Sequence, residues 1–511
     1  MKRLSIIFAL CAALLLIVTS CSKKQSANLI PDDAIVVVRL DPVTMQKQSG
    51  LNDGKSGLSK WMKDNLNDTD MPKKLRKMAL EIIDDPMASG IDFSEPLFFY
   101  VAGEDIERKP DLGLVGCIAS QDKLSELVEE VTDLLDIDVK EADGGIKYVS
   151  AEDGALVYSA DWFYLGTAFD IDETIETLKQ RVEGKNTLAG NDTFEKMCNK
   201  DGLMQMLFLG SGFEDLISST PELKEAMKEA MKTMPEGVKL EDMAYLADLS
   251  LGDGEMLLVS EYLPLSSAMR DYFNECEKIV GDISKDQTRY MSGRFLNAFL
   301  NIDAKKYFDI MKPMLENELG DEAAEAMPLI EEVVNNLDGT LSAELYDIKE
   351  GQPQFNIYVG TKNSDALDLF MAQTGMELES NAPGEYLIPN TEYDFESDSL
   401  VTTGYFGLGF KNGQTYFTSD PEQAFTEPSD KFPASELKGK GFYIRFNFGA
   451  LNDLAKNADS EERDLMNKVA GTYDYVEAYY EKGGKGIFRI TTKSKKTNPV
   501  KALIEMVKEY L

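Results

Sequence analysis

The sequence lacks the side chain that most often performs acid–base chemistry at neutral pH, because none of its 511 residues is a histidine. This composition excludes Ser-His-Asp and Cys-His nucleophiles and any histidine-ligated zinc or haem site. Ser120 and Lys123 match the S-x-x-K nucleophile motif, in which the serine opens a helix. The S-D-N and K-T-G motifs that would complete this chemistry are absent, and Lys496-Thr497-Asn498 only approaches the second. We therefore interpret Ser120 as the N-cap of a helix.

Acidic residues are so numerous, at 90, that close pairs of them carry little information. Asp394, Glu396 and Asp398 alternate as in a calcium loop. An EF-hand would need Gly and Glu at the positions of Ser399 and Tyr405, so we interpret this stretch as a solvated acidic loop. Two carboxylates can hydrolyse a glycoside without histidine, and such a hydrolase stays open as an alternative function. The sequence predicts no catalytic residue, no metal ligand and no cofactor.

Cys21 is the one residue for which the sequence predicts a chemical modification. Lys2 and Arg3 precede an apolar segment, residues 4–18, that is too short for a normal transmembrane span. The segment ends in Val18-Thr19-Ser20-Cys21, which resembles the lipobox of bacterial lipoproteins. The resemblance implies cleavage before Cys21 and attachment of lipid to its sulfur and amino group. The alternative is an ordinary secretory signal that happens to contain a cysteine.

The expected N-terminal organisation is a signal peptide over residues 1–20 and a polar tether over residues 21–29. Ser22-Lys23-Lys24 follows the cysteine, so the known inner-membrane retention signal, an Asp at the next position, is absent. No acidic run resembles a surface-export signal. We predict attachment to the outer membrane, facing the periplasm, with display on the cell surface as the alternative. Because no other apolar run is long enough to span a bilayer, the lipid on Cys21 is the predicted contact with the membrane.

The chain is strongly acidic, with a formal net charge of −37 at pH 7. This charge is spread along the chain, favours solubility and repels nucleic acid, which we exclude as a partner. Loss of the signal peptide would leave Cys117, Cys198 and Cys276 besides Cys21. Three cysteines are too few for an all-cysteine zinc site and do not form a disulfide framework. We interpret Cys117 and Cys276 as packing residues.

Four stretches share one pattern, which is an apolar strand, a short polar or glycine break, and the start of a helix. In the first stretch, Asp41 and Pro42 stand at the N-cap and at the first helical position. Asp303 stands at the same place in the third stretch. Each stretch opens a module of strand, helix, strand, strand, helix. The four stretches are 34–45, 203–216, 295–311 and 442–454.

The order of elements in a module, with one final strand added, is that of ferredoxin-like folds. Ile146–Ser150 and Glu385–Ile388 are candidates for that strand in modules one and three. Long and short modules alternate, so we infer a tandem duplication with halves at residues 30–285 and 290–511. The expected class is α+β, with antiparallel sheets and helices on one face. One continuous sheet across both halves is the alternative arrangement.

The lipobox and four further segments carry a resemblance to a known family. The segments are NLIPDDAIVVVRLDP from Asn28, SGLNDGKSGL from Ser49, DPMASGIDFSEPLFFY from Asp85 and YFGLGFKNGQ from Tyr405. Together they resemble the domain-of-unknown-function family 4836, lipoproteins of Bacteroidota. The resemblance covers essentially the whole chain and implies export, lipid anchoring and a repeated α+β fold. The family carries no established activity, so no catalytic residue is transferred from it.

These observations favour a non-catalytic envelope lipoprotein that serves as a binding or scaffolding component for unidentified envelope partners. One alternative is the carboxylate-based hydrolase, acting on an envelope polymer or glycan. Another is a passive ligand carrier with an apolar cavity between modules. Trp162, Phe163 and Tyr164 would suit a sugar-stacking platform, but their place in a predicted hairpin favours core packing.

Overall fold

Antiparallel pairing accounts for the strand ladders in the described part of the chain, as the sequence predicts. No helix among the described residues is long and apolar enough to cross a membrane. The protein is seen in a computed structural model. It describes residues 63, 66, 234 and 235 and the ranges 26–49, 72–103, 110–212, 237–252, 254–320, 323–349, 352–374, 379–382, 384–394 and 399–510.

The described residues form two compact units. The first unit takes its residues from 1–227, 238–269 and 495–511, and the second from 228–237 and 270–494. The C-terminal helix α16 (Pro499–Tyr510) therefore belongs to the first unit and not to the half in which the sequence places it.

The first unit contains a mixed α+β arrangement around one antiparallel sheet. Its strand order is β10-β9-β8-β1-β2-β3-β7-β6-β5-β4. The main helices are α2 (Pro42–Ser49), α4 (Lys73–Asp84), α5 (Gln121–Leu135), α6 (Ile171–Val182) and α7 (Asp192–Cys198). The strands are β1 (Val36–Leu40), β2 (Leu97–Ala102), β3 (Asp111–Cys117), β4 (Lys140–Ala142), β5 (Ile146–Ala151), β6 (Gly154–Tyr158), β7 (Trp162–Thr167), β8 (Met204–Leu209), β9 (Met243–Gly252) and β10 (Glu255–Pro264).

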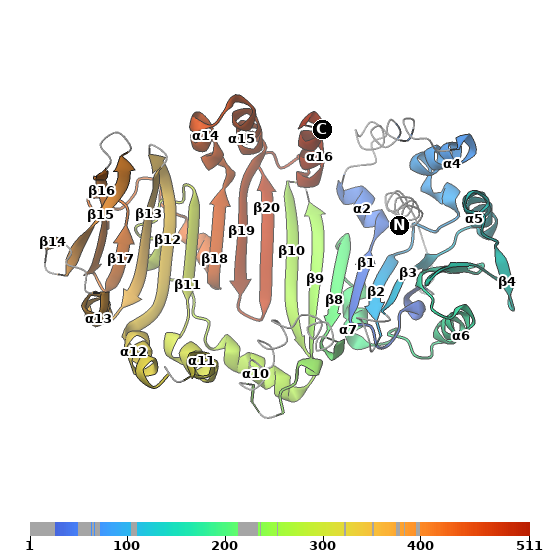
Figure 1. The fold of residues 1–511 in the computed structure, drawn as a ribbon, viewed down its shortest axis with the longest axis horizontal. Helices are drawn as coiled ribbons and strands as arrows, with labels where there is room; N and C mark the ends of the chain where they lie inside the picture. Colours follow the sequence, from blue (N-terminus) through green and yellow to red (C-terminus); the bar gives the residue numbers. More distant parts are fainter. Residues whose placement is uncertain are drawn as a thin grey trace. The chain divides into compact units, whose positions relative to one another are not determined.

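The second unit has the strand order β20-β19-β18-β11-β12-β13-β17-β16-β15-β14. Place by place, this is the order of the first unit with each number raised by ten (Figure 1). The strands are β11 (Leu296–Asn301), β12 (Leu337–Lys349), β13 (Gln352–Thr361), β14 (Glu379–Ala382), β15 (Glu385–Asp394), β16 (Ser399–Lys411), β17 (Gln414–Thr418), β18 (Lys440–Asn447), β19 (Tyr473–Glu481) and β20 (Lys485–Thr492).

The helices that connect the central strands of the second unit lie at the strand ends. In Figure 1, α11 (Ala304–Leu319) and α12 (Ala323–Asn336) lie at one end of β11 and β12. Helices α14 (Leu451–Leu454) and α15 (Ser460–Thr472) lie at the opposite end, above β18 and β19. The remaining helices are α10 (Ser267–Glu277), which contains the sequence boundary between the units, and α13 (Asp365–Thr374).

The strand pairing corrects the ferredoxin-like prediction. A split β-α-β arrangement places another strand between the two strands that the helix connects. Here β1 pairs directly with β2, and β11 pairs directly with β12. The predicted final strands are β5 and β15, which lie inside the meanders β4–β7 and β14–β17. The physical reason is visible in the second unit, where the α11–α12 pair returns the chain at one strand end to the neighbouring strand (Figure 1).

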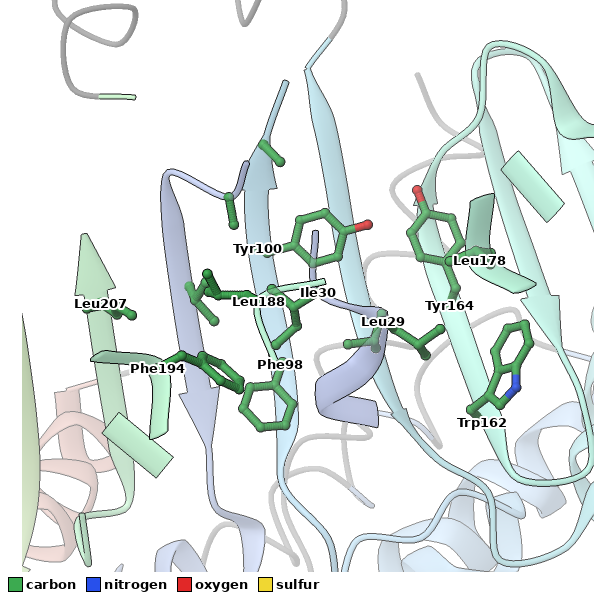
Figure 2. Close-up of a cluster of buried hydrophobic side chains, with 14 of the residues drawn as sticks. Leu29, Ile30, Phe98, Tyr100, Trp162, Tyr164, Leu178, Leu188, Phe194 and Leu207 are labelled. Atoms are coloured by element: carbon green, nitrogen blue, oxygen red, sulfur yellow. The ribbon is translucent and has the colours of Figure 1, made fainter. Parts of the chain in front are cut away.

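Both faces of the first unit's sheet are covered at β7, so the prediction of helices on one face is wrong there. Trp162, Phe163 and Tyr164 are all buried. Trp162 and Tyr164 pack with Leu178 of α6 in one buried cluster (Figure 2). Phe163 points to the other face and packs with Leu124 of α5. These contacts confirm core packing as the role of the three aromatic residues.

The first described residues belong to the folded body rather than to a tether. Residues 26–29 form the 3-10 helix η1 (Ser26–Leu29), and Leu29 is fully buried. Ile30 follows in the same buried cluster (Figure 2). The expected tether over 21–29 is therefore too long at its C-terminal end, because the apolar pair Leu29-Ile30 gains more from burial than from exposure.

Candidate functional site

The second unit's sheet carries apolar side chains on both of its faces. In β11, Asn297 and Phe299 are buried, whereas Leu296, Ala298 and Leu300 are partly exposed. An antiparallel sheet with one solvated face normally alternates apolar residues inward and polar residues outward. Here the outward residues are apolar. This departure from the usual pattern marks the outward face as a candidate site, because large exposed apolar patches mark interaction surfaces.

The outward residues of β11 pair with outward residues of the neighbouring strands and form three rows across the sheet. We call these three rows the open face of the second unit. The middle row crosses eight strands and contains no polar side chain. It consists of Phe488, Ala478, Ile444, Ala298, Ala343, Ile357, Phe417 and Leu408. The flanking rows consist of Ile490, Val476, Phe446, Leu296, Leu345 and Phe355, and of Gly486, Tyr480, Phe442, Leu300, Leu341, Val359, Thr415 and Phe410.

The open face of the second unit is a large apolar patch for a protein surface. None of its side chains is buried, and Phe442 and Phe488 are 41% and 37% exposed. With strands about 4.8 Å apart and a rise of about 3.4 Å per residue, three rows over eight strands cover roughly 600 Å². That is the upper end of the range for the largest apolar patch on a typical monomer. The rows hold no charged side chain, so their chemistry is purely apolar.

The first unit has a corresponding open face on β2, β1, β8, β9 and β10. Its middle row runs from Phe99 through Val38 and Met206 to the buried Ala247 and then to Ser260. Phe99 is 38% exposed, and Tyr262 of a flanking row is 49% exposed. Beyond β2 the same side of the sheet is covered by α5, so this open face is the smaller one, at roughly 400 Å² on the same dimensions.

The buried face of the second unit carries a row of polar residues beside its aromatic core cluster. One row across its sheet consists of Arg489, Glu477, Arg445, Asn297, Glu344, Asn356 and Thr418. Glu344 accepts hydrogen bonds from the backbone N–H of Ser292 at 2.6 Å, from its hydroxyl at 2.8 Å and from Asn356 at 2.8 Å. Burial raises the pKa of Glu344.

Glu477 is held in a similar way. The Tyr443 hydroxyl donates to it at 2.5 Å and the Arg489 guanidinium at 2.9 Å. Because the carboxylates of Glu344 and Glu477 are 5% and 3% exposed and already accept two or more hydrogen bonds, we assign them to the structure of the buried face rather than to catalysis.

A polar cavity of about 410 Å³ lies in the first unit, where β1 leads into α2. Arg39 lines it and donates to Asp41 at 2.9 Å and to Gln205 at 2.5 Å. The other oxygen of Asp41 accepts from the backbone N–H of Thr44 at 2.8 Å. Asp41 is therefore the helix cap that the sequence predicts. Both of its oxygens are engaged, which makes it a poor general acid or base.

The other sequence candidates do not converge on this cavity. Ser120 caps α5 by accepting from the backbone N–H of Lys123 at 3.4 Å, which confirms it as a cap. Asp303 caps α11 by accepting from Lys306 N–H at 3.1 Å. Asp170 caps α6 at 3.0 and 3.1 Å. Among the described residues, no three His, Cys, Asp or Glu side chains gather as metal ligands.

Some predicted residues fall outside what the structure describes or occupy unremarkable places. Cys21 lies before the first described residue, and Glu396 and Asp398 of the acidic loop lie in a gap. Cys117 is buried in β3 and Cys276 is half-buried in α10, and burial raises the pKa of both thiols. Cys198, half-buried, lines the polar cavity.

Sequence reasoning missed the open faces and Arg39. The signal for the open faces was present in strands such as FYIRFNF, where apolar residues fill nearly every position and the polar ones share one parity. Such a strand suits burial on both faces. That its outward side chains are not buried follows from tertiary structure and cannot be read from the strand itself. Arg39 stands out only once Gln205 of β8 is placed opposite it in the sheet.

Two α+β units, each with one open apolar sheet face, define the class of this protein. Over residues 26–440 the chain matches the family described as Domain of unknown function (DUF4836), and it belongs to that family. No protein with curated annotation matches the chain in sequence.

Solved structures of crystal forms IV, III and I of TP0453 are distantly similar. The identities are 11%, 12% and 11%, and the TM-scores are 0.27, 0.27 and 0.25. The matches cover 46%, 52% and 48% of this chain and 79%, 90% and 80% of the other. Similarity at this level supports no inference about function.

Proposed function

We propose that the protein is a lipid-anchored, non-catalytic binding or scaffolding protein of the cell envelope, and that its open sheet faces are the binding surfaces. The observation that carries the proposal is the set of apolar side chains that stay partly exposed on the outward face of the second unit's sheet. Leaving roughly 600 Å² of apolar surface in water costs about 25 cal/mol per Å², or on the order of 15 kcal/mol if all of it were later covered. A surface of this kind is stable in a cell when something binds it.

The anchor in this proposal is lipid on Cys21, and the location is the outer membrane, on the periplasmic side. Support comes from the lipobox-like Val18-Thr19-Ser20-Cys21 and from the absence of Asp after the cysteine. Display on the cell surface is the alternative location. Protease treatment of intact cells distinguishes them, because only a surface-displayed chain is digested without permeabilisation.

The two-unit architecture is proposed to come from a tandem duplication of one ancestral unit. Support comes from the strand order, which is the same in both units. Asp41 and Asp303 also cap helices at equivalent places after β1 and β11. A duplicated scaffold that keeps one open face in each copy suits a binding role, since each copy presents the same kind of surface.

A carboxylate-based hydrolase is the second candidate, and the polar cavity is the place for it. Asp41 and Asp201 both line this cavity. The binding role is favoured because Asp41 is already held by Arg39 and by the N-terminus of α2. Turnover of a glycan, peptide or ester library by the purified protein would overturn the non-catalytic proposal.

The binding role is tested by crosslinking the tethered protein in intact cells and identifying what co-purifies. Phe442→Asp with Phe488→Asp places two charges on the open face of the second unit, and both positions are exposed enough to accept them. We expect this double variant to lose the molecules that co-purify with the wild type. Tyr307→Asp is the matched control, because Tyr307 is 49% exposed and lies on α11, which contributes no residue to the open face. Identical recovery from all three proteins would contradict the proposal.

A further inference from the structure

We propose that the open face of the second unit binds the hydrocarbon chains of individual membrane lipids. The inference rests on the proposed function and specifies what kind of molecule the open face takes. It is carried by the chemistry of the three rows, by the charge of the chain and by the short distance between the anchor and the folded body.

The open face offers hydrophobic contact and almost no hydrogen bonding. The backbone N–H and C=O groups of its strands form hydrogen bonds to neighbouring strands in the ladders from β20 to β17. Among its side chains, only the hydroxyls of Tyr480 and Thr415 are polar. A protein partner of standard size makes about ten direct hydrogen bonds and presents a surface that is little more than half apolar. A hydrocarbon chain needs none of these bonds, so it matches the open face better than a folded protein does.

A second copy of this chain fits less well than a lipid. The open face is roughly 600 Å² by strand spacing, whereas a stable interface buries about 800 Å² on each partner. Each copy also carries a formal charge of −37, so association of two copies brings like charges together. A neutral hydrocarbon chain meets no such repulsion.

The anchor would keep the body close to a source of lipid. The folded body begins at Ser26, and Leu29 and Ile30 are fully buried. Ser26 is five residues after Cys21 in the chain, and an extended chain spans at most about 3.5 Å per residue. The first folded residue would therefore lie within roughly 18 Å of the lipidated cysteine. At that distance the effective concentration of membrane lipid around the protein is high.

The test uses cis-parinaric acid, a fluorescent fatty acid, with the mature-length Cys21→Ala chain in detergent-free solution. We expect saturable binding, weakened at least tenfold by Phe442→Asp with Phe488→Asp and unchanged by Tyr307→Asp. Circular dichroism and the urea unfolding midpoint verify that each variant is folded. A second variant pair, Phe442→Ser with Phe488→Ser, retains the test if the aspartates prevent folding.

Three results would overturn the inference. The first is the absence of saturable binding, or equal binding by all variants. The second is a wild-type dimer in sedimentation at micromolar concentration that the double variant abolishes, which would assign the open face to a second copy. The third is co-sedimentation of the wild type with phosphatidylcholine vesicles without parinaric acid binding, which would assign it to a bilayer surface. If parinaric acid does not bind but crosslinking still recovers partners through the open face, the proposed function stands and this inference fails.

Discussion

Cys21→Ala is expected to transfer the protein from the membrane fraction to the soluble fraction almost completely. Each methylene buried in a bilayer contributes about 0.8 kcal/mol, and two or more acyl chains give stable anchoring where one chain gives only marginal binding. In the proposed anchor these chains are attached to Cys21, and alanine at this position does not complete a lipobox, so all of the chains would be lost. No helix among the described residues offers a second means of crossing the membrane. The measurement is the distribution of the protein between fractions after cell lysis and alkaline washing.

Two controls make this experiment decisive. Cys198→Ala removes a half-buried thiol that has no part in anchoring, and it should leave the protein in the membrane. The Cys21→Ala chain must also be cleaved, because an uncleaved chain would keep the apolar segment 4–18 and could stay in the membrane through it. Replacing residues 1–20 with an ordinary secretory signal ensures this cleavage. Retention of the cleaved Cys21→Ala chain in washed membranes would mean that the anchor is not a lipid on Cys21.

Gly339→Ala is expected to destabilise the second unit by about 3 kcal/mol or more. Gly339 lies at an irregularity of β12, where the pairing with β13 shifts between Leu337 and Leu341, and its φ is +90°. A Cβ atom there would lie 1.6 Å from the carbonyl oxygen of Ile302. Ile302 in turn donates to the carbonyl of Gly339 at 3.0 Å. The methyl group would therefore force apart the backbones of β11 and β12 in the middle of the sheet that carries the open face.

Two other glycines separate the causes of this loss. Gly404→Ala in β16 meets nothing within 4 Å and its φ is not positive, so we expect a change of about 0.5 kcal/mol or less. A Cβ atom at Gly384 would also meet nothing within 4 Å, but the φ of Gly384 is +75°. Gly384→Ala therefore reports backbone strain alone, which we expect to destabilise the unit by about 1 kcal/mol. The measurement is the urea unfolding midpoint of each variant. A Gly339→Ala loss no larger than that of Gly384→Ala would contradict the close approach to Ile302.

Local elements were largely predictable from the sequence because their signals are local. Ser120, Asp41 and Asp303 cap the helices that the sequence assigns to them, since an N-cap depends on the next three residues. The sequence Gly252-Asp253-Gly254 is a strong local signal for a hairpin, and the β9–β10 ladder flanks it. The antiparallel class also follows from strand pairs joined by short turns.

Sheet order and coverage were not predictable, because they depend on contacts between distant residues. Nothing near β1 in the sequence indicates that β2 and β8 lie on its two sides. A module of strand, helix, strand, strand, helix is compatible with more than one pairing, and the ferredoxin-like choice was wrong. Whether an apolar strand face is covered depends on the path of every helix, which is why the open faces appear only in the structure.

The candidate site depends on the same non-local information. The apolar composition of the strands around Phe299 and Tyr443 predicts a buried core. Only the register shows that Asn297, Glu344 and Asn356 share the buried side and leave apolar residues outward. The sequence therefore directs attention to carboxylates and serines, whereas the candidate site in the structure consists of apolar side chains.

The most direct test of the account is whether the open face of the second unit is covered in the cell. Phe488→Cys and Tyr307→Cys introduce one thiol each at positions of 37% and 49% exposure, on the open face and on α11. Each is labelled with a maleimide that passes the outer membrane, in intact cells and in the mature-length Cys21→Ala chain purified without detergent. The parent protein, with Cys117, Cys198 and Cys276, gives the background.

In the purified chain, we expect Phe488→Cys to react with the maleimide at a rate similar to that of Tyr307→Cys. In cells, we expect Phe488→Cys to react at least tenfold more slowly than Tyr307→Cys. Protection confined to the open face would show that a ligand or partner occupies it where the protein works. Equal labelling of the two positions in cells would show that the face stays bare, and it would contradict the claim that this surface is the binding site.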